Sequence, residues 1–383
     1  MKRSMKCLRI ALALTASAVF SISFAEDLLI GQAAPLSGTL ADTGKEMVLG
    51  AKIYFDFVND HGGINGKKIK HLVKDDGYKV PETVRVVKEL VEKDHVLALI
   101  GSAGSAHLAA VLKEKTLANA GIAMMSPYTG SVGLREPFAD TKNLFHIRAS
   151  YADEAEGIVD QLMALQVDKI AVFHQDDAFG NAGLDGVIAA LKRRGKTIVA
   201  SGSYVANSPP DAGVEEAVKK ISAADPSAVV MWSTNAYTSA FVKKIRPISR
   251  IVQFVNVSVV NADTIYKLAG SKMARGVGIA QVMPFPYSNT FPIIKEYMAA
   301  LKKYGGGAKE NYTSLEEYIG AKVLVEGLRR AGPNPTREKV YRALETLSAY
   351  DVGGFTVHFS PASHAGSSFV EITVIGRDGK LIR

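Results

Sequence analysis

The chain has 383 residues and a formal net charge of +8, from 46 Lys or Arg against 38 Asp or Glu. This charge is mild, and the sequence has no basic block and no stripe of basic and aromatic residues, so it lacks the signature of a nucleic-acid-binding protein. The length exceeds what one hydrophobic core comfortably supports, and it predicts two domains.

Residues 1–25 have the pattern of a secretory signal peptide. Four basic residues open the chain: Lys2, Arg3, Lys6 and Arg9. A small and apolar run follows at 10–20, and Ser23 and Ala25 occupy the minus-three and minus-one places of a cleavage site. The run is too short to cross a membrane as a mature helix, so an uncleaved anchor is the less favoured alternative. We expect a cleaved and exported protein.

The chain after residue 25 has a formal charge of +4, because the signal contains four basic residues and no acid. The only cysteine, Cys7, lies within the signal. We therefore expect neither a disulfide nor thiolate chemistry in the exported part, which is long enough to bury a core without disulfides. It has no second long apolar stretch, so the sequence predicts no transmembrane helix there.

Before residue 150, short apolar runs alternate with segments of helical spacing. The nearly continuous apolar run at 96–100 is typical of a parallel strand that is covered on both faces. Apolar residues three or four apart indicate one buried face on each helix between the strands. We expect strands at 28–34, 69–74, 96–100 and 122–125, and helices at 47–58, 84–91 and 106–120.

The same alternation repeats after residue 150. We expect strands at 170–173, 198–204, 228–232 and 251–255, and helices at 158–165, 182–194, 214–223 and 236–245. Thr313 and Glu316 have the spacing of a capping box before a further helix, which Gly332-Pro333 ends. The tail from 353 to 382 predicts antiparallel strands with a hairpin turn at 377–379. Two runs of βα units predict an α/β protein with two doubly wound lobes.

The first strand-to-helix junction that could bind a ligand is 101–106. Ala103 and Gly104 are small and let another group approach the backbone, and the start of the next helix offers free N–H groups to an anion. Ser105 adds a hydroxyl donor. The alternative is an ordinary glycine-rich turn with Ser105 as the helix cap.

Two further junctions have a similar character. In the segment 126–131, Tyr128 is expected in a pocket wall rather than as a simple surface tyrosine, because open α/β sheets bind ligands at such junctions. In the segment 174–180, Asp176 and Asp177 could face a ligand cation, although helix capping is the more natural role for one of them. Phe179 could stack on a ligand or bury itself in its lobe.

Enzyme signatures are weak. The sequence has no Gly-x-Ser-x-Gly elbow, no His-Glu-x-x-His motif, no dinucleotide fingerprint and no phosphate loop. Its eight histidines show no metal spacing. Asp75-Asp76 is the best remaining carboxylate pair, and a solvated turn is its expected setting. We expect no catalytic residue, no metal and no cofactor.

The combined motifs resemble the periplasmic leucine/isoleucine/valine-binding proteins of ABC importers. The resemblance covers nearly the whole chain from about Leu28 to Gly379, and its opening is the most specific part. It rests on Ala34-Pro-Leu-Ser-Gly38, Gly44, Gly50-Ala51, Asn59, Gly62-Gly-Ile-Asn-Gly66, Asp75-Asp76, Ile100-Gly101, Ser126-Pro127 and the Asp176–Gly180 segment.

The resemblance implies the type I fold, in which two similar Rossmann-like lobes are joined by three crossing segments. It places residues 26–148 and 281–354 in lobe 1, and 149–280 and 355–383 in lobe 2. A small-molecule ligand would lie between the lobes. Delivery to membrane permease subunits, a periplasmic location and a monomeric state would follow.

The resemblance also implies a set of ligand-binding residues. Ser105 would bind the ligand carboxylate, helped by backbone N–H groups near Tyr128 and Gly130 and by the Thr129 hydroxyl. The facing lobe would contribute Phe179 and the segment Trp232-Ser-Thr-Asn235.

One departure concerns the ligand ammonium. The branched-chain binders place a glutamate after the strand that matches 251–255, where this chain has Asn256-Val-Ser258. Either Asp177, Asp42 or Asp153 supplies the counter-charge, or the ligand has no ammonium group.

Three functions therefore stay open. The leading one is a receptor for a small amino acid of the branched-chain type, with an aromatic or aliphatic carboxylate that has no amino group as the alternative ligand. An exported α/β hydrolase that uses a cleft carboxylate such as Asp177 is a weaker reading, since no nucleophile is evident. A sensor subunit that signals to a partner would use the same two lobes.

Overall fold

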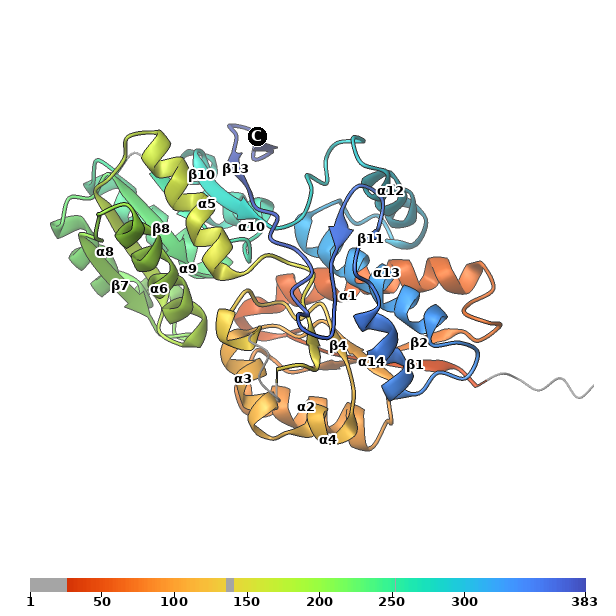
Figure 1. Cartoon of the computed structure of the whole chain (residues 1–383). Coiled ribbons are helices and arrows are strands. Elements are labelled where there is room, and N and C mark those ends of the chain that lie inside the picture. Colours follow the sequence, from red (N-terminus) through yellow and green to blue (C-terminus); the bar gives the residue numbers. More distant parts are fainter. Residues whose placement is uncertain (1–25, 136–140, 252) are drawn as a thin grey trace, which may run out of the picture.

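The computed structural model describes residues 26–135, 141–251 and 253–383, and the expected signal peptide at 1–25 lies outside these residues. The described chain forms two α/β lobes that lie side by side (Figure 1). Each lobe is built on its own sheet, and helices cover both faces of each sheet. The predicted fold class, a type I arrangement of two doubly wound lobes, is confirmed.

The sheet of lobe 1 has five parallel strands. Their spatial order is β2 (Ile69–Asp75), β1 (Leu28–Ala34), β3 (Ala98–Ile100), β4 (Met124–Met125) and β5 (Leu144–Phe145). Alternate side chains of each strand point to opposite faces, so Ile30 and Ile100 join one core layer while Ala33 and Leu99 join the other.

The sheet of lobe 2 has seven strands. The five that come first in the chain are parallel, and the two that come last in the chain join the sheet by antiparallel pairing. Their spatial order is β14 (Leu381–Ile382), β13 (Glu371–Ile375), β10 (Val277–Gln281), β9 (Gln253–Asn256), β8 (Ala228–Trp232), β6 (Ile170–Gln175) and β7 (Ala200–Tyr204). The predicted hairpin near the end of the chain is confirmed by the β13–β14 pairing.

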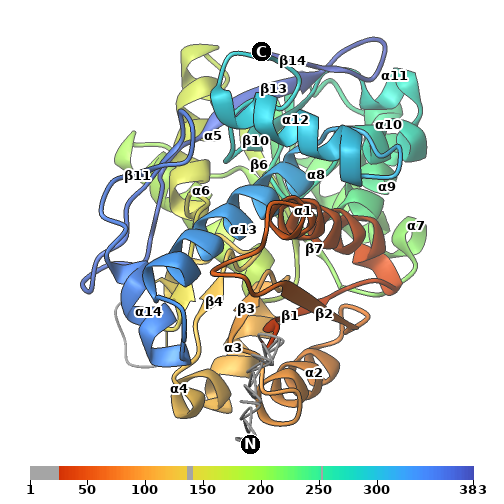
Figure 2. The same ribbon diagram turned by 90° about the vertical axis from the view of Figure 1, so that its right-hand side faces the viewer.

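Seven α-helices belong to lobe 1 in the described residues. They are α1 (Ala41–Asp60), α2 (Val80–Glu92), α3 (Ser105–Lys113), α4 (Thr116–Ala120), α12 (Pro292–Tyr304), α13 (Tyr312–Arg330) and α14 (Arg337–Glu345). The long helices α1 and α13 pack against each other on one face of the sheet (Figure 2). This packing ties the first part of lobe 1 to a segment about 270 residues further along the chain.

The helices of lobe 2 cover its sheet in the same way. They are α5 (Tyr151–Ala164), α6 (Ala178–Arg193), α7 (Pro210–Gly213), α8 (Glu215–Ala223), α9 (Asn235–Ile245), α10 (Ala262–Ala269) and α11 (Ser271–Ala274). Three single 3-10 turns complete the described helices: η1 (Gly38–Leu40), η2 (Val132–Leu134) and η3 (Arg246–Ile248). Helices α5 and α6 pack together over the face that Val172 and Val230 present.

The chain passes between the lobes before α5, after β10 and before β13 (Figure 1). A short hairpin of β11 (Tyr350–Asp351) and β12 (Thr356–Val357) precedes the last passage. After it, Ala365 bridges His146, and Phe359 packs on Phe145 of lobe 1. On this pairing we propose that the third crossing lies between Gly366 and β13 rather than at residue 355.

Two local expectations were wrong. The helix predicted at 106–120 is two helices, because Lys115 adopts a left-handed backbone with φ of 56° and neither Gly nor Pro marks the break. The capping box at Thr313 and Glu316 is absent: Asn311 caps α13 by accepting from the Ser314 N–H, and Thr313 and Glu316 lie inside the helix. Within the described part of the chain, no helix has the length and apolar character needed to cross a membrane.

Candidate ligand-binding site between the lobes

A small cavity lies between the two lobes. Its walls come from both of them: Leu40, Tyr78, Ala103, Gly104 and Tyr128 of lobe 1, and Tyr151, Phe179, Thr234 and Val259 of lobe 2. These residues follow the carboxyl ends of parallel strands, where open α/β sheets place their ligands. Its free volume is about 20 Å³, room for about one water molecule and far below the roughly 300–1,000 Å³ of ligand pockets, so the lobes are nearly closed on one another here.

The N-terminus of α3 forms one wall of the cavity. Gly104 is the N-cap and has a φ of 101°, a backbone that favours glycine, and a Cβ there would lie 2.4 Å from His107 Nδ1. Because Gly104 has no side chain to accept from the first helical N–H groups, this helix end remains able to bind an anion. Ser105 is the first residue of the helix, so the alternative in which Ser105 is the cap is wrong.

Two of the predicted hydroxyls lie together just behind this wall. Ser105 Oγ and Thr129 Oγ1 are 2.7 Å apart, and both side chains are buried. The backbone of Tyr128 is already used, since its N–H donates to Ser102 O. Ser105 and Thr129 therefore lie beside the lining residues Gly104 and Tyr128, and they do not themselves line the cavity.

Gly130 contacts the other lobe directly. A Cβ at Gly130 would be 2.4 Å from the Tyr151 ring, and the Gly130 carbonyl accepts from the Tyr151 N–H at 2.6 Å. The junction at 126–131 thus contacts the start of α5 in the other lobe directly.

Four of the nine described residues that line the cavity are aromatic. Tyr78 stacks on His107 with ring centroids 4.3 Å apart, and Tyr151 lies edge-on to Phe179 at 5.6 Å. Burial raises the pKa of the Tyr78 and Tyr128 hydroxyls well above the usual range, so both stay neutral. Trp232 lies one layer behind, fully buried and edge-on to Tyr151 at 5.8 Å. These rings provide an apolar surface that suits a ligand with a compact apolar side chain.

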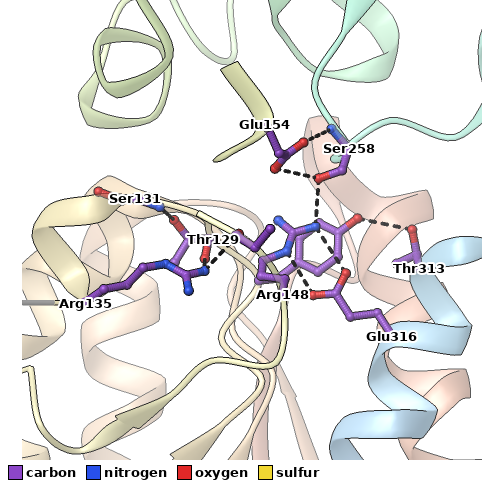
Figure 3. Close-up of polar contacts among 10 residues, drawn as sticks. Thr129, Ser131, Arg135, Arg148, Glu154, Ser258, Thr313 and Glu316 are labelled. Atoms are coloured by element: carbon purple, nitrogen blue, oxygen red, sulfur yellow. Dashed lines mark hydrogen bonds and ion pairs between the residues drawn. The ribbon is translucent and has the colours of Figure 1, made fainter. Parts of the chain in front are cut away.

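Buried charged groups lie at the base of the cavity, where the first crossing begins (Figure 3). The Arg148 guanidinium pairs with Glu316 through Nε–Oε1 at 2.9 Å, and its Nη2 donates to Ser258 Oγ at 3.0 Å. Ser258 in turn donates to Glu154, from its N–H at 2.9 Å and from its Oγ at 3.0 Å. Desolvation raises the pKa of Glu154 to about 7, against the lowering effect of Arg148.

The three proposed counter-charges for a ligand ammonium are all engaged elsewhere. Asp177 caps α6 by accepting from the N–H groups of Phe179 and Gly180, and its other oxygen accepts from Gln175. Asp153 forms a capping box with Ser150. Asp42 lines a separate polar groove with Lys45 and Asp263. No acidic side chain lines the cavity itself.

The remaining predicted residues have mixed positions. Phe179, Tyr128, Ala103 and Gly104 line the cavity. Asn235 lies at the start of α9 and its Oδ1 accepts from the Asn261 N–H at 2.7 Å, which fixes a loop of lobe 2. No group of three His, Cys, Asp or Glu in the described residues could hold a metal ion.

The Asp75-Asp76 turn differs from its expected setting. Asp75 accepts from Ser37 Oγ at 2.7 Å and so holds the 35–38 loop, while Asp76 is buried and accepts from Thr83 Oγ1 at 2.8 Å. The solvated turn was therefore wrong for Asp76. Its role is to fix the start of α2 beside the cavity residue Tyr78, whose N–H it also accepts from.

The lobes also meet at the rim of the cavity. Thr39 of lobe 1 donates from Oγ1 to Asn207 Oδ1 of lobe 2 at 2.9 Å, and Asn207 Nδ2 donates to the Tyr78 carbonyl at 3.5 Å. Together with the bond at Ser258, these contacts hold the lobes against each other on two sides of the cavity.

A family model described as periplasmic binding protein matches residues 28–380. The chain belongs to the periplasmic binding protein family. An amino acid binding protein of Pseudomonas aeruginosa is 27% identical over 349 residues, which cover 89% of this chain and 88% of that protein. Leu/Ile/Val-binding protein homolog 7 of Brucella abortus is 24% identical and covers 84% of this chain and 82% of its own length.

A solved substrate-binding periplasmic protein from Ralstonia solanacearum has the same fold, with a TM-score of 0.86 and 36% identity over 93% of this chain and 99% of that one. The resemblance to leucine/isoleucine/valine-binding proteins is confirmed, and these relatives are binding proteins. Membership of this family implies a location outside the cytoplasm.

For this periplasmic binding protein, sequence reasoning missed four cavity residues, namely Leu40, Tyr78, Tyr151 and Val259, whereas Thr234 lies in the predicted segment 232–235. Tyr78 and Tyr151 each follow the end of a strand or a crossing, so the same junction rule could have found them. It also missed the buried charges of Arg148, Glu154 and Glu316. Nothing in their local sequence marks them, since their partners are 104 to 168 residues away.

Proposed function

We propose that this protein is the solute receptor of an ABC importer, which captures a small carboxylate between its lobes and delivers it to permease subunits in the membrane. The observation that carries the proposal is the cavity, because residues of both lobes line it. A ligand that contacts both lobes stabilises their closed arrangement in proportion to its differential affinity for it. The start of α3 and the nearby Ser105 hydroxyl supply donors for the carboxylate.

The first candidate ligand is a small amino acid of the branched-chain type. It is supported by the names of the relatives, an amino acid binding protein and a Leu/Ile/Val-binding protein homolog. The apolar walls would accept a branched side chain. Its ammonium would need a counter-charge such as Glu154, which accepts from Ser258 in the segment where the resemblance places a glutamate.

The second candidate is a carboxylate without an amino group. It is favoured by the absence of any acid among the residues that line the cavity and by the engagement of Asp177 and Asp153 in helix caps. A buried ammonium without a partner is strongly unfavourable, so such a cavity would discriminate against amino acids.

Paired ligands separate the two candidates. We would titrate the protein with L-leucine and with 4-methylpentanoate, which differ only in the amino group, and likewise with L-phenylalanine and 3-phenylpropanoate. Isothermal titration gives the affinities, and thermal unfolding gives the stabilisation expected by mass action. Binding of L-leucine alone supports the first candidate, and binding of 4-methylpentanoate alone supports the second. If none of the four binds, the proposed ligand class is wrong.

Delivery and location need separate tests. Cleavage of the signal after Ala25 predicts a periplasmic protein that begins at Glu26, which N-terminal sequencing of the exported protein can check. Transport predicts that the loaded receptor stimulates ATP hydrolysis by its reconstituted permease. A sensor subunit would leave that activity unchanged.

A further inference from the structure

Arg148 lies at the start of the first crossing and connects two pairs of residues that belong to different lobes (Figure 3). One pair, Arg148 with Glu316, is internal to lobe 1. The other, Ser258 with Glu154, is internal to lobe 2. A single hydrogen bond of 3.0 Å, from Arg148 Nη2 to Ser258 Oγ, joins them across the lobes.

The same guanidinium contacts a wall of the cavity. Its carbon lies 4.4 Å from the centroid of the Tyr128 ring, and the Tyr128 hydroxyl is 3.2 Å from Thr313 Oγ1 of α13. On the other side, Val259 follows Ser258 in the chain and lines the cavity from lobe 2. Arg148 thus contacts the lining residue Tyr128 directly. It also binds Ser258, the chain neighbour of the lining residue Val259.

The two kinds of contact respond differently to movement of the lobes. The Arg148–Glu316 pair and the stacking on Tyr128 stay within lobe 1, so they persist when the lobes separate. The bond to Ser258 joins residues of different lobes, so we expect it to break when the lobes separate. A buried arginine whose donors lack partners is costly, so its environment favours the arrangement that satisfies more of them.

We propose that Arg148 is the positioning residue that couples occupation of the cavity to closure of the lobes, through its stacking on Tyr128 and its hydrogen bond to Ser258. The inference rests on the proposed function, because closure matters only if the cavity binds a ligand. A contact present in one arrangement and absent in the other shifts the population between them. Loss of a charge-assisted bond of this kind changes such an equilibrium roughly ten- to a hundredfold.

Ser258→Ala tests the proposal, because it removes the bond from Arg148 to lobe 2 and leaves the Arg148–Glu316 pair intact. It also removes the bond from Ser258 Oγ to Glu154, which Arg148→Lys leaves in place. Double electron–electron resonance between two spin labels measures the distance between the lobes. The labels are attached at Lys113→Cys of α3 and Lys192→Cys of α6, which are both exposed positions. The unmodified chain has no cysteine after Cys7, so only these two sites are labelled. Ser222→Ala, which removes a half-buried hydroxyl within α8, is the matched control.

We expect Ser258→Ala to shift the label distances toward longer values without any added ligand, and to weaken binding of L-leucine or 4-methylpentanoate at least tenfold. Arg148→Lys should act in the same direction, because a lysine cannot serve Glu316 and Ser258 together in this geometry. Ser222→Ala should change neither the distances nor the affinity.

Unchanged label distances in both Ser258→Ala and Arg148→Lys would overturn the proposal. The distance measurement needs no ligand, so it stands apart from the proposed function. If distances shift while neither L-leucine nor 4-methylpentanoate binds, the proposed ligand class is wrong and the role of Arg148 is retained.

Discussion

Ser105 is the residue whose chemistry bears most directly on a carboxylate ligand. Its hydroxyl lies in a buried environment at the start of α3, 2.7 Å from Thr129 Oγ1. We expect Ser105→Ala to weaken binding of the tightest carboxylate in the paired titrations by about 1–3 kcal/mol, because a desolvated carboxylate loses a donor. Isothermal titration measures the change.

Ser271→Ala is a suitable control for this variant. Ser271 also follows a glycine N-cap with a positive φ, but it is exposed and begins the short helix α11, away from the cavity. Equal affinities for Ser105→Ala and the unmodified protein would remove Ser105 from the site.

Glu154 gives the molecule a pH-dependent stability. Its pKa is raised from 4.5 to about 7 by burial, so between these pH values the folded protein binds more protons than the unfolded chain. The free energy of unfolding therefore falls as pH rises through this window, by at most about 3 kcal/mol from this group. Glu154→Gln should flatten the fall without abolishing it, because burial also raises the pKa of Glu317.

Urea unfolding at pH 5, 6, 7 and 8 measures this dependence. The exposed Glu216→Gln variant of the same lobe is the control and should keep the slope of the unmodified protein. A Glu154→Gln profile that falls as steeply as the control would contradict the prediction.

The residues of the site were predictable to unequal degrees. Gly104 and Tyr128 belong to junctions after strands, and the rule that ligands lie at carboxyl ends of strands placed them at the cavity, with Ser105 and Thr129 beside them. Glu154 and Glu316 could not be found in this way, because each acquires its role from a partner in a distant segment. Glu316 was assigned to a capping box on spacing alone, whereas the side chain points to Arg148.

At the scale of elements, the geometry of α3 depends on its glycine cap. Gly104→Ala places a Cβ 2.4 Å from His107 Nδ1 and forces alanine to a φ of 101°. We expect a loss of about 1–3 kcal/mol in the free energy of unfolding, together with weaker carboxylate binding, since the free N–H groups would be displaced. Urea unfolding and titration measure the two effects.

The Gly270→Ala variant distinguishes the effect of backbone strain from the effect of the steric clash that Gly104→Ala creates. Gly270 is also an N-cap, with a φ of 80°, but a Cβ there would meet nothing within 4 Å. It should lose less stability than Gly104→Ala and keep its affinity. Equal losses in both variants would show that the contact with His107 has no effect.

The elements themselves were largely predictable. Buried parallel strands such as β1 and β8 are nearly continuous apolar runs, and their bounds match the prediction. The break between α3 and α4 was not predictable, since Lys115 adopts a left-handed backbone that its residue type does not favour. The helix α12 was also missed, although Pro292 at its first turn is a usual start signal.

At the scale of the whole molecule, the contacts at the rim should set how long a ligand stays bound. Thr39→Val removes the hydroxyl that donates to Asn207 and keeps the shape of the side chain. Because this bond is exposed, we expect dissociation to accelerate only a few-fold, corresponding to about 0.5–1 kcal/mol. Stopped-flow measurement with the tightest ligand of the panel checks the rate.

Thr290→Val is the corresponding control, because Thr290 is exposed and its hydroxyl contacts only Ser288 in the described structure. A Thr39→Val rate that equals that of the control would show that the rim bond does not retain the ligand. The sequence predicted two lobes and a connection that crosses repeatedly, but not this rim, because Asn207 lies in a loop with no distinguishing pattern.

The position of Trp232 has a practical consequence. It is the single tryptophan of the chain, and it lies edge-on to Tyr151, a ring that lines the cavity. Any ligand that displaces Tyr151 or Phe179 alters the electric field and the quenching groups around the Trp232 indole. Selective excitation of tryptophan therefore offers a dye-free optical signal from one position beside the cavity, fast enough to follow ligand capture in real time.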